Sequence, residues 1–332
     1  MKYCFAPMEG ITGYVYRNAH HQFFNQIDQY YTPFITPNQT RTLTSREVND
    51  VLPEHNSGVR VVPQILTNKA EDFLWAAGKM KELGYDEVNL NLGCPSGTVV
   101  SKKRGSGFLA FPSELDEFLY QVSGGLQQME MRLSVKTRIG KERPEEFEEL
   151  LRIYNQYPLS SLIIHPRVQT DYYKNHPNWE VFKIAAENSR NPVCYNGDVF
   201  SVQNILTFRR QFPQVGTLML GRGLLTNPAL TRMAEIAADG TIAAHDHILD
   251  KQRFRSFHDA VLAGYRKAIP GDRNVLFKMK ELWFYMGDAF SDGTKYVKKI
   301  RKAEKMGDYT AAVSRIFSEC EISENPVFAG WR

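Results

Sequence analysis

The chain has 332 residues, of which 42% are hydrophobic and 12% aromatic, and its net charge is a mild +4. This length can bury a large core and permits one large domain, or a large domain with a smaller one. No run approaches 18 apolar residues, and Met1–Phe5 is typical of a strand, so we expect no membrane span and no signal peptide.

The four cysteines lie far apart in the sequence, at Cys4, Cys94, Cys194 and Cys320. They form no CxxC pair and have no zinc-ligand spacing, so we expect no metal site. Unpaired thiols are typical of a reducing compartment. The sequence therefore favours a cytoplasmic protein.

The charge is unevenly distributed. Residues 250–305 contain 14 Lys and Arg against 7 Asp and Glu, which leaves the remaining residues slightly acidic. A basic segment on a near-neutral body indicates a polyanionic partner, and nucleic acid is the first candidate. A solvated helical surface would give the same count.

Apolar strand-like runs alternate with helical patterns up to about residue 236. Eight such runs and their crossovers match the size of a (β/α)8 TIM barrel, which we predict for residues 1–240. An open doubly wound sheet is the alternative, but the first run is followed by Ala6–Gly10, which is no glycine-rich fingerprint. The predicted strands are Tyr3–Pro7, Ile27–Tyr31, Val59–Leu66, Glu87–Leu92, Leu133–Thr137, Leu162–His165, Pro192–Asn196 and Thr217–Gly221.

Strand patterns stop near residue 248. Ile248–Ile269, Val275–Met286 and Ala311–Ser318 have helical patterns, so we predict a small, basic, all-helical domain over residues 248–332. Its aromatic residues are expected to form a core and its lysines and arginines an exposed face.

The most unusual strand is Val88–Leu92, where apolar residues alternate with Asn89 and Asn91 before Gly93-Cys94-Pro95. Buried amides are costly unless something pairs with them. Because this strand ends at the barrel mouth, Cys94 is expected there too. An isolated Gly-Cys-Pro would otherwise indicate a turn with a buried thiol.

Polar residues also mark the carboxyl ends of the other predicted strands, where barrel enzymes place their chemistry. The glycines near Arg222 suit the phosphate of a cofactor. Lys136 and His165 could stabilise negative charge on a reduced flavin ring. The candidate functional residues at these strand ends are Pro7, Met8, Glu9, Gln64, Lys136, His165, Asn196, Gly197, Asp198, Gly221 and Arg222.

Taken together, these motifs resemble the tRNA-dihydrouridine synthases, FMN enzymes that reduce a uridine in tRNA. The matching pieces occur in the family's order over residues 6–223, and a basic helical segment follows them. They are Ala6–Gly10, Pro63–Ile65, Asn89–Pro95, Lys136–Arg138, His165-x-Arg167, Asn196–Asp198 and Gly221–Gly223.

The resemblance implies bound FMN, with the candidate residues at the strand ends, from Pro7 to Arg222, as its cofactor-binding residues. It also implies NADPH or NADH as reductant, tRNA as partner, Cys94 as proton donor and Asn91 near the target base. Two features depart from the family's usual pattern: a basic pair, Lys102 and Lys103, beside a glycine-rich loop, and Pro166 where a small residue is usual. We expect tRNA contacts from basic residues, namely Lys102, Lys103, Arg104, Arg273, Lys278, Lys280, Lys298 and Lys299.

Two other functions compete. An FMN barrel acting on a free pyrimidine would use nearly the same chemistry but gives no reason for the basic helices. An RNA-binding protein without catalysis would not need Cys94, Lys136 and His165 together. The sequence does not indicate which uridine is reduced, which nicotinamide is preferred, or the oligomeric state.

Overall fold

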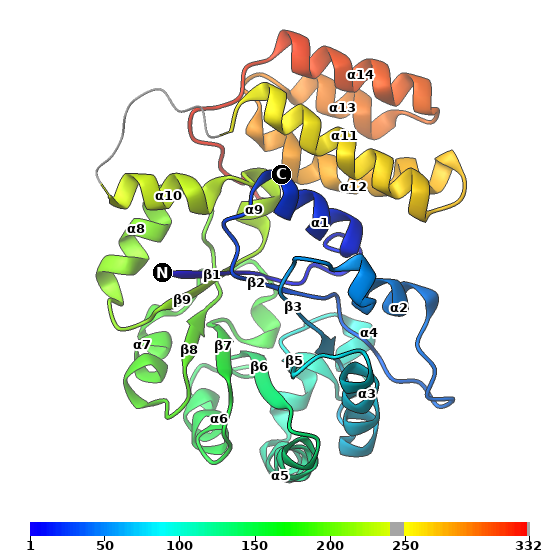
Figure 1. Ribbon diagram of the computed structural model, residues 1–332. Coiled ribbons are helices and arrows are strands. Elements are labelled where there is room, and N and C mark those ends of the chain that lie inside the picture. The colour runs from blue at the N-terminus through cyan, green and yellow to red at the C-terminus, as the bar shows by residue number, and fades with distance from the viewer. Residues whose placement is uncertain (240–248, 331–332) are drawn as a thin grey trace. The chain divides into compact units, whose positions relative to one another are not determined.

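A computed structural model describes residues 1–239 and 249–330 (Figure 1). These residues form two compact units, which we describe separately. The first unit comprises Met1–Pro7, Asp28–Asp198 and Phe212–Met219, and the second comprises Met8–Ile27, Val199–Gln211 and the described part of Leu220–Arg332. The predicted domain boundary at residues 240–248 lies outside the described residues.

The first unit is built on one parallel sheet with the strand order β3-β2-β1-β9-β8-β7-β6-β5-β4. The two edge strands, β3 and β4, are separated in the chain by Pro63 alone, so the sheet closes on itself as a barrel (Figure 1). The strands are β1 (Lys2–Phe5), β2 (Gln29–Tyr31), β3 (Val61–Val62), β4 (Gln64–Ile65), β5 (Glu87–Leu92), β6 (Arg132–Arg138), β7 (Ser161–His165), β8 (Val193–Tyr195) and β9 (Thr217–Leu220).

The predicted barrel is confirmed, and each predicted strand overlaps an observed one. The predicted strand Val59–Leu66 is divided in two because Pro63 has no N–H to donate to the sheet. Outside the sheet, the first unit contains the helices α2 (Ser45–Val51), α3 (Ala70–Glu82), α4 (Gly97–Val100), α5 (Pro112–Gln128), α6 (Glu146–Tyr154) and α7 (Trp179–Asn188), with 3-10 turns at Pro53–His55, Gly105–Ala110 and Gln169–Asp171.

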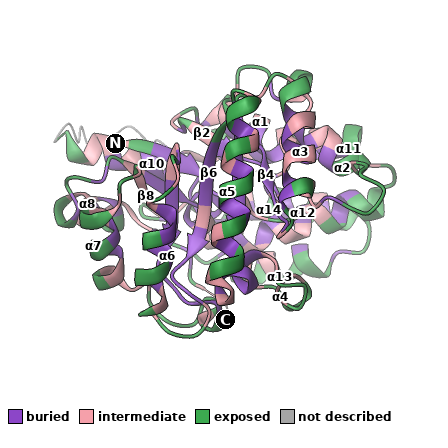
Figure 2. Ribbon diagram, turned by 90° about the horizontal axis from the view of Figure 1, so that it is seen from below, coloured by how far each residue is buried: buried purple, intermediate pink, exposed green. Residues whose placement is uncertain are grey.

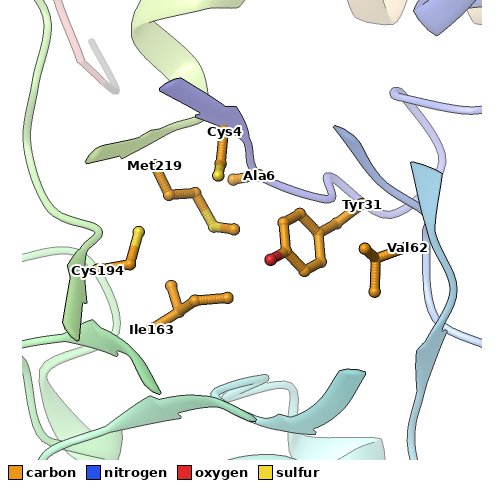
Figure 3. Close-up of a cluster of buried hydrophobic side chains, with 7 residues drawn as sticks. All are labelled: Cys4, Ala6, Tyr31, Val62, Ile163, Cys194 and Met219. Atoms are coloured by element: carbon orange, nitrogen blue, oxygen red, sulfur yellow. The ribbon is translucent and has the colours of Figure 1, made fainter. Parts of the chain in front are cut away.

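The barrel interior includes a cluster of buried apolar, aromatic and sulfur-containing side chains. Figure 3 shows Tyr31, Ile163, Cys194 and Met219 converging from different strands, together with Cys4, Ala6 and Val62. Outside the sheet, helices bury one face only: α5 buries Leu119 and Val122 but exposes Tyr120 (Figure 2). This half-buried pattern is the periodicity that predicted the helices.

The second unit is helical. It contains α1 (Tyr14–Phe23), α8 (Val202–Gln211), α9 (Arg222–Thr226), α10 (Leu230–Ala238), α11 (Lys251–Ala268), α12 (Asp272–Met286), α13 (Thr294–Lys302) and α14 (Met306–Glu319), with a 3-10 turn at Gly287–Ala289. Trp283, Tyr285 and Tyr296 are buried, as expected of a core, whereas Phe277 is 63% exposed and the expectation was wrong for it. No helix within residues 1–239 and 249–330 is long and apolar enough to cross a membrane.

Candidate active site

The strand β5 carries its two asparagine side chains toward the barrel interior, where they bond to neighbouring strands. Gln64 Nε2 donates to Asn89 Oδ1 (2.7 Å), and Asn89 Nδ2 donates to Ser134 Oγ (2.9 Å). Asn91 Nδ2 donates to Gln64 Oε1 (2.7 Å). The buried amides of β4 and β5 and the Ser134 hydroxyl of β6 therefore satisfy one another, which removes the cost that the sequence predicted for the amides.

In the loop after β5, hydrogen bonds hold the Cys94 backbone at both its N–H and its carbonyl group. Asn91 Oδ1 accepts hydrogen bonds from the backbone N–H groups of Gly93 and Cys94, each at 3.0 Å. The Cys94 carbonyl accepts from Ser106 N (3.1 Å) and Ser106 Oγ (2.8 Å). Gly105 has a φ of +55°, and a Cβ there would lie 2.7 Å from Cys94 O. This loop therefore presents one thiol in a fixed place.

The Cys94 thiol is half-buried, and this burial raises its pKa above the ordinary value. The hydrogen bond from the Ser96 backbone and the charges of Arg138 and Lys136 act in the opposite direction but do not reverse the shift. A thiol with a raised pKa is protonated at neutral pH. In this state the thiol carries its proton and is a poor nucleophile.

Lys136 pairs in register with Asn91 and shares the inward face of β6 with Ser134. Burial, followed by the charge of Arg138, lowers its pKa to about 8. Within the described chain its Nζ has no hydrogen-bond or ion-pair partner. A desolvated, unpaired cation inside a barrel is suited to an anionic or electron-accepting ligand.

The neighbouring arginine has a different role. Arg138 donates from Nε to Gly93 O (3.0 Å), from Nη1 to Val168 O (2.8 Å) and from Nη2 to Tyr172 O (2.7 Å). It therefore ties the Cys94 loop to the loop that follows β7.

On β7, His165 pairs in register with Arg138 and faces inward with Ile163. Its Nε2 lies 3.0 Å from Arg167 Nη1. Arg167 also makes a bidentate ion pair with Asp198, at 2.9 and 2.5 Å. The structure thus brings Asp198 to Arg167, a partner that the sequence did not predict.

After β8, Asn196 Nδ2 donates to Met219 O (2.9 Å). Gly197 is required where it lies, because a Cβ there would be 2.1 Å from the hydroxyl of Tyr195. Pro7 ends the first segment of this unit, two residues after the last residue of β1.

The comparisons with known proteins identify the family. A model of the family described as dihydrouridine synthase (Dus) matches residues 4–314. The chain belongs to the dihydrouridine synthase family.

Two relatives of this dihydrouridine synthase show the extent of the match. A probable tRNA-dihydrouridine synthase 2 of Bacillus subtilis is 29% identical over 230 residues, which cover 67% of this chain and 69% of the relative. The tRNA-dihydrouridine(16) synthase of Vibrio parahaemolyticus is 23% identical over 350 residues, covering 98% of this chain and all of the relative.

Solved structures support the fold. A 2-naphthoyl-CoA reductase complex gives a TM-score of 0.54 at 9% identity, covering 72% of this chain and 50% of that one. Morphinone reductase gives 0.50 at 12% identity, covering 71% and 87%. At such identities the likeness shows the barrel fold alone.

Membership makes this dihydrouridine synthase a flavin-dependent oxidoreductase that reduces uridine. The residues present fit a flavin, because the unpaired cation of Lys136 lies among amides inside the barrel. No group of three or more His, Cys, Asp or Glu in the described ranges is arranged to hold a metal.

Four predicted cofactor residues belong to the second unit. Met8 and Glu9 lie in a turn in which Met8 N donates to Thr12 Oγ1 (2.8 Å) and Gly10 has a φ of +77°. Gly221 directly precedes the short α9 helix, and Arg222 stacks on Phe200 and Phe328, with ring centres at 4.9 and 5.5 Å. Their contact with a flavin stays a prediction.

The basic residues expected to bind tRNA have different environments. Lys102, Arg273, Lys298 and Lys299 are exposed, and Arg104 is half-buried. Lys103 lies 4.0 Å from the centre of the Phe111 ring.

Two lysines expected on the exposed face of the helices are only half-exposed, and that expectation was wrong for them. Lys278 Nζ donates to Gly10 O (2.7 Å), and Lys280 Nζ donates to Ala303 O (2.8 Å). Both side chains turn back to bind backbone carbonyls of their own unit, although a role in tRNA binding stays a prediction.

Sequence reasoning missed Tyr173. Its ring centre lies 6.1 Å from that of His165 and 5.5 Å from Arg138 Cζ, and the residue is 42% exposed. Adjacent tyrosines, Tyr172 and Tyr173, in an otherwise polar loop after the β7 strand were the pattern that could have indicated it.

Proposed function

We propose that this chain reduces the C5–C6 double bond of a uridine in tRNA to 5,6-dihydrouridine, with FMN as its flavin, NADPH or NADH as reductant and Cys94 as proton donor. The observation that carries this proposal is a half-buried thiol whose backbone is held at the end of β5, next to Lys136, whose Nζ has no hydrogen-bond or ion-pair partner among the described residues. Family membership supports uridine as the substrate.

Gln64, Lys136 and His165 are the residues of the first unit that we assign to the flavin ring. Bound flavin supplies a hydride to one carbon of the uracil C5–C6 bond. Lys136 contributes positive charge in a desolvated place, where it interacts strongly with negative charge on a ligand. The phosphate is assigned to the glycines and cation predicted from the sequence, namely Gly197, Gly221 and Arg222.

Cys94 completes the reduction by giving its thiol proton to the other carbon. General acid catalysis needs a group that is protonated at the working pH and close to the reacting atom. The raised pKa of Cys94 meets the first condition, and the bonds from Asn91 and Ser106 to its backbone support the second. Tyr173 offers an exposed aromatic face on which a base could stack.

A uridine within folded tRNA must leave its stack to reach an enzyme barrel, at a cost of a few kcal/mol. We assign the offsetting phosphate contacts to the exposed basic residues, with Lys298 and Lys299 foremost.

The relative that matches over its whole length is named for position 16, so we propose uridine 16 as the target. The free, unlinked thiols of Cys4 and Cys194 support a cytoplasmic location.

The decisive experiment incubates the purified protein with NADPH and tRNA that lacks dihydrouridine. Formation of dihydrouridine, mapped to position 16, is the expected result. Free uracil and orotate serve as parallel substrates, and turnover of these with none on tRNA would replace the proposal with the free-pyrimidine reductase. Protein that binds tRNA but purifies without flavin absorbance and cannot be reconstituted with FMN would indicate an RNA-binding role without catalysis. Dihydrouridine at another position would support the proposed reaction and reject uridine 16 as its target.

A further inference from the structure

We propose that Arg167, held by Asp198, is a positioning residue that fixes His165 in the tautomer with the proton on Nδ1. This inference rests on the proposed function, in which His165 is assigned to the flavin ring. It also explains the departure from the family's usual pattern at Pro166.

The backbone turns sharply between His165 and Arg167. Arg167 N donates to His165 O at 2.7 Å, a bond between residues two apart that closes a γ-turn around Pro166. The inverse form of this turn needs a central φ near −75°, which the proline ring supplies. Pro166 therefore folds the Arg167 side chain back toward the imidazole.

The guanidinium group is buried and bonded on every nitrogen. Nε donates to Asn175 O (2.6 Å), and Nη2 donates to Asp198 Oδ2 (2.5 Å). Nη1 donates to Asp198 Oδ1 (2.9 Å) and lies 3.0 Å from His165 Nε2. The planar fork of an arginine cannot rotate without breaking the bidentate pair, so Nη1 is held against the imidazole.

The chemistry of the two groups fixes the tautomer. A guanidinium group has donors only and stays protonated, so His165 Nε2 must accept with its lone pair. The single ring proton of the neutral imidazole is then on Nδ1. A proton on Nε2 would face the Nη1 donor directly and leave a buried Arg167 hydrogen without an acceptor, which is costly.

This arrangement makes His165 a directed donor on the inward face of β7. Hydrogen-bond donors stabilise a transition state best when they are already oriented toward the atom on which negative charge develops. A lysine at position 167 could not form the bidentate pair with Asp198. Without that pair, the His165 imidazole would not be held in one orientation. Arg167 and Asp198 thus act on the reaction through His165, without contact to the reacting atoms.

The test is the tautomer itself, read from the nitrogen chemical shifts of 15N-histidine-labelled protein. Unprotonated and protonated ring nitrogens resonate far apart, and His165→Gln identifies the signals. We expect an unprotonated Nε2 and a protonated Nδ1 in the unaltered chain. A protonated Nε2 overturns the proposal, and this result is read from the unaltered chain, with the variant used only to assign the signals.

The double variant Arg167→Met, Asp198→Asn removes both charges together, so no buried ion is left unpaired. We expect a mixture of tautomers at His165 and a decrease of about tenfold or more in dihydrouridine formation. Lys79→Gln, which removes an exposed ion pair with Glu82 on α3, is the control and should change neither readout.

The two readouts separate this inference from the proposed function. A single Nδ1–H tautomer that persists in the double variant would show that the arginine and aspartate only hold the loop, and would overturn the inference. A shifted tautomer in a protein that makes no dihydrouridine would support the positioning role and reject the reaction.

Discussion

Asn91 Oδ1 lies 3.0 Å from the backbone nitrogen of Cys94 and accepts its hydrogen bond. The same oxygen accepts from Gly93, while Asn91 Nδ2 donates to Gln64 on the adjacent strand. One buried amide thus connects the β4 strand to the loop that carries the proposed acid. Asn91 is therefore an anchor for Cys94, in addition to any contact with a substrate base.

The variant Asn91→Ala should loosen this loop. It leaves two N–H groups without an acceptor, which costs about 1–3 kcal/mol for each one that stays buried. We expect slower dihydrouridine formation and faster alkylation of Cys94 by iodoacetamide, both measured on folded protein. Asn188→Ala, an exposed asparagine at the end of α7, is the control. Unchanged alkylation in Asn91→Ala would show that other bonds suffice to hold the thiol.

Gly105 offers a second, independent way to move the thiol. Its φ of +55° is in the left-handed region, and an added Cβ would lie 2.7 Å from Cys94 O and 3.1 Å from Cys94 Cβ. We expect Gly105→Ala to lower stability by about 1–3 kcal/mol and to lower activity further, because the Cys94 backbone must shift.

The control for this change is Gly78→Ala on α3, where a Cβ meets nothing within 4 Å. It should stabilise the chain slightly, since alanine favours a helix. Thermal unfolding and the dihydrouridine assay measure both variants. Full activity in Gly105→Ala would mean that the loop tolerates the displacement.

Much of the barrel could be predicted because each strand alternates or is continuously apolar and its crossovers have helical periodicity. Cys94 could be placed at a strand end for the same reason. The partners of Asn89 and Asn91 could not, because cross-strand register decides them and no single strand reports its neighbour's register. Asp198 was assigned to the cofactor, whereas the γ-turn at Pro166 brings Arg167 to its carboxylate.

The helical unit shows a similar limit. The helix α13 was missed because only Tyr296 and Ile300 are buried in a run dominated by lysine and arginine. Lys278 was expected on an exposed face, since charge alone does not reveal that a lysine can bury its stem and bind a carbonyl such as Gly10 O. Neither feature changes the prediction of a helical unit.

Cys94→Ala should separate the two halves of the reaction. Removing the thiol leaves Lys136, His165 and Gln64 in place, so reduction of bound flavin by NADPH should be retained. Dihydrouridine formation should slow by about 10²-fold or more, in line with the loss of a general acid. Stopped-flow absorbance follows the first step and product analysis the second. Cys320→Ala, a buried thiol of the second unit, is the control, and full turnover by Cys94→Ala would reject Cys94 as the donor.

Exposed and half-buried lysines should affect tRNA binding differently. The slope of log affinity against log salt falls by about 1 for each phosphate contact removed. We expect Lys298→Gln with Lys299→Gln to reduce this slope by about 2. Lys278→Gln should leave the slope nearly unchanged and lower thermal stability instead, because its Nζ binds Gly10 O. Equal slopes in the double variant and the unaltered chain would remove these two lysines from the tRNA interface.

Two histidines of the second unit are buried without charge. His20 Nε2 lies 3.2 Å from Pro228 O, and burial lowers the pKa of His20 to about 3. His258 contacts Asp259 through Nδ1 and the Tyr309 hydroxyl through Nε2, and burial lowers its pKa as well. In the unfolded chain both should titrate near 6.5.

The stability of the chain should therefore fall in mild acid. Below about pH 6.5 the unfolded chain binds protons that the folded chain does not, so His20 lowers the free energy of unfolding by about 1.4 kcal/mol per pH unit, and the lowered pKa of His258 acts in the same direction. For His20 this loss continues down to about pH 3, where the folded ring also protonates. Urea unfolding between about pH 7 and 5, above the range in which most carboxylates titrate, measures the slope. His20→Gln keeps a donor for Pro228 O and should reduce the slope, leaving the part due to His258, whereas the exposed His176→Gln should not change it. An unfolding free energy that stays constant over this range would show that neither ring is held neutral.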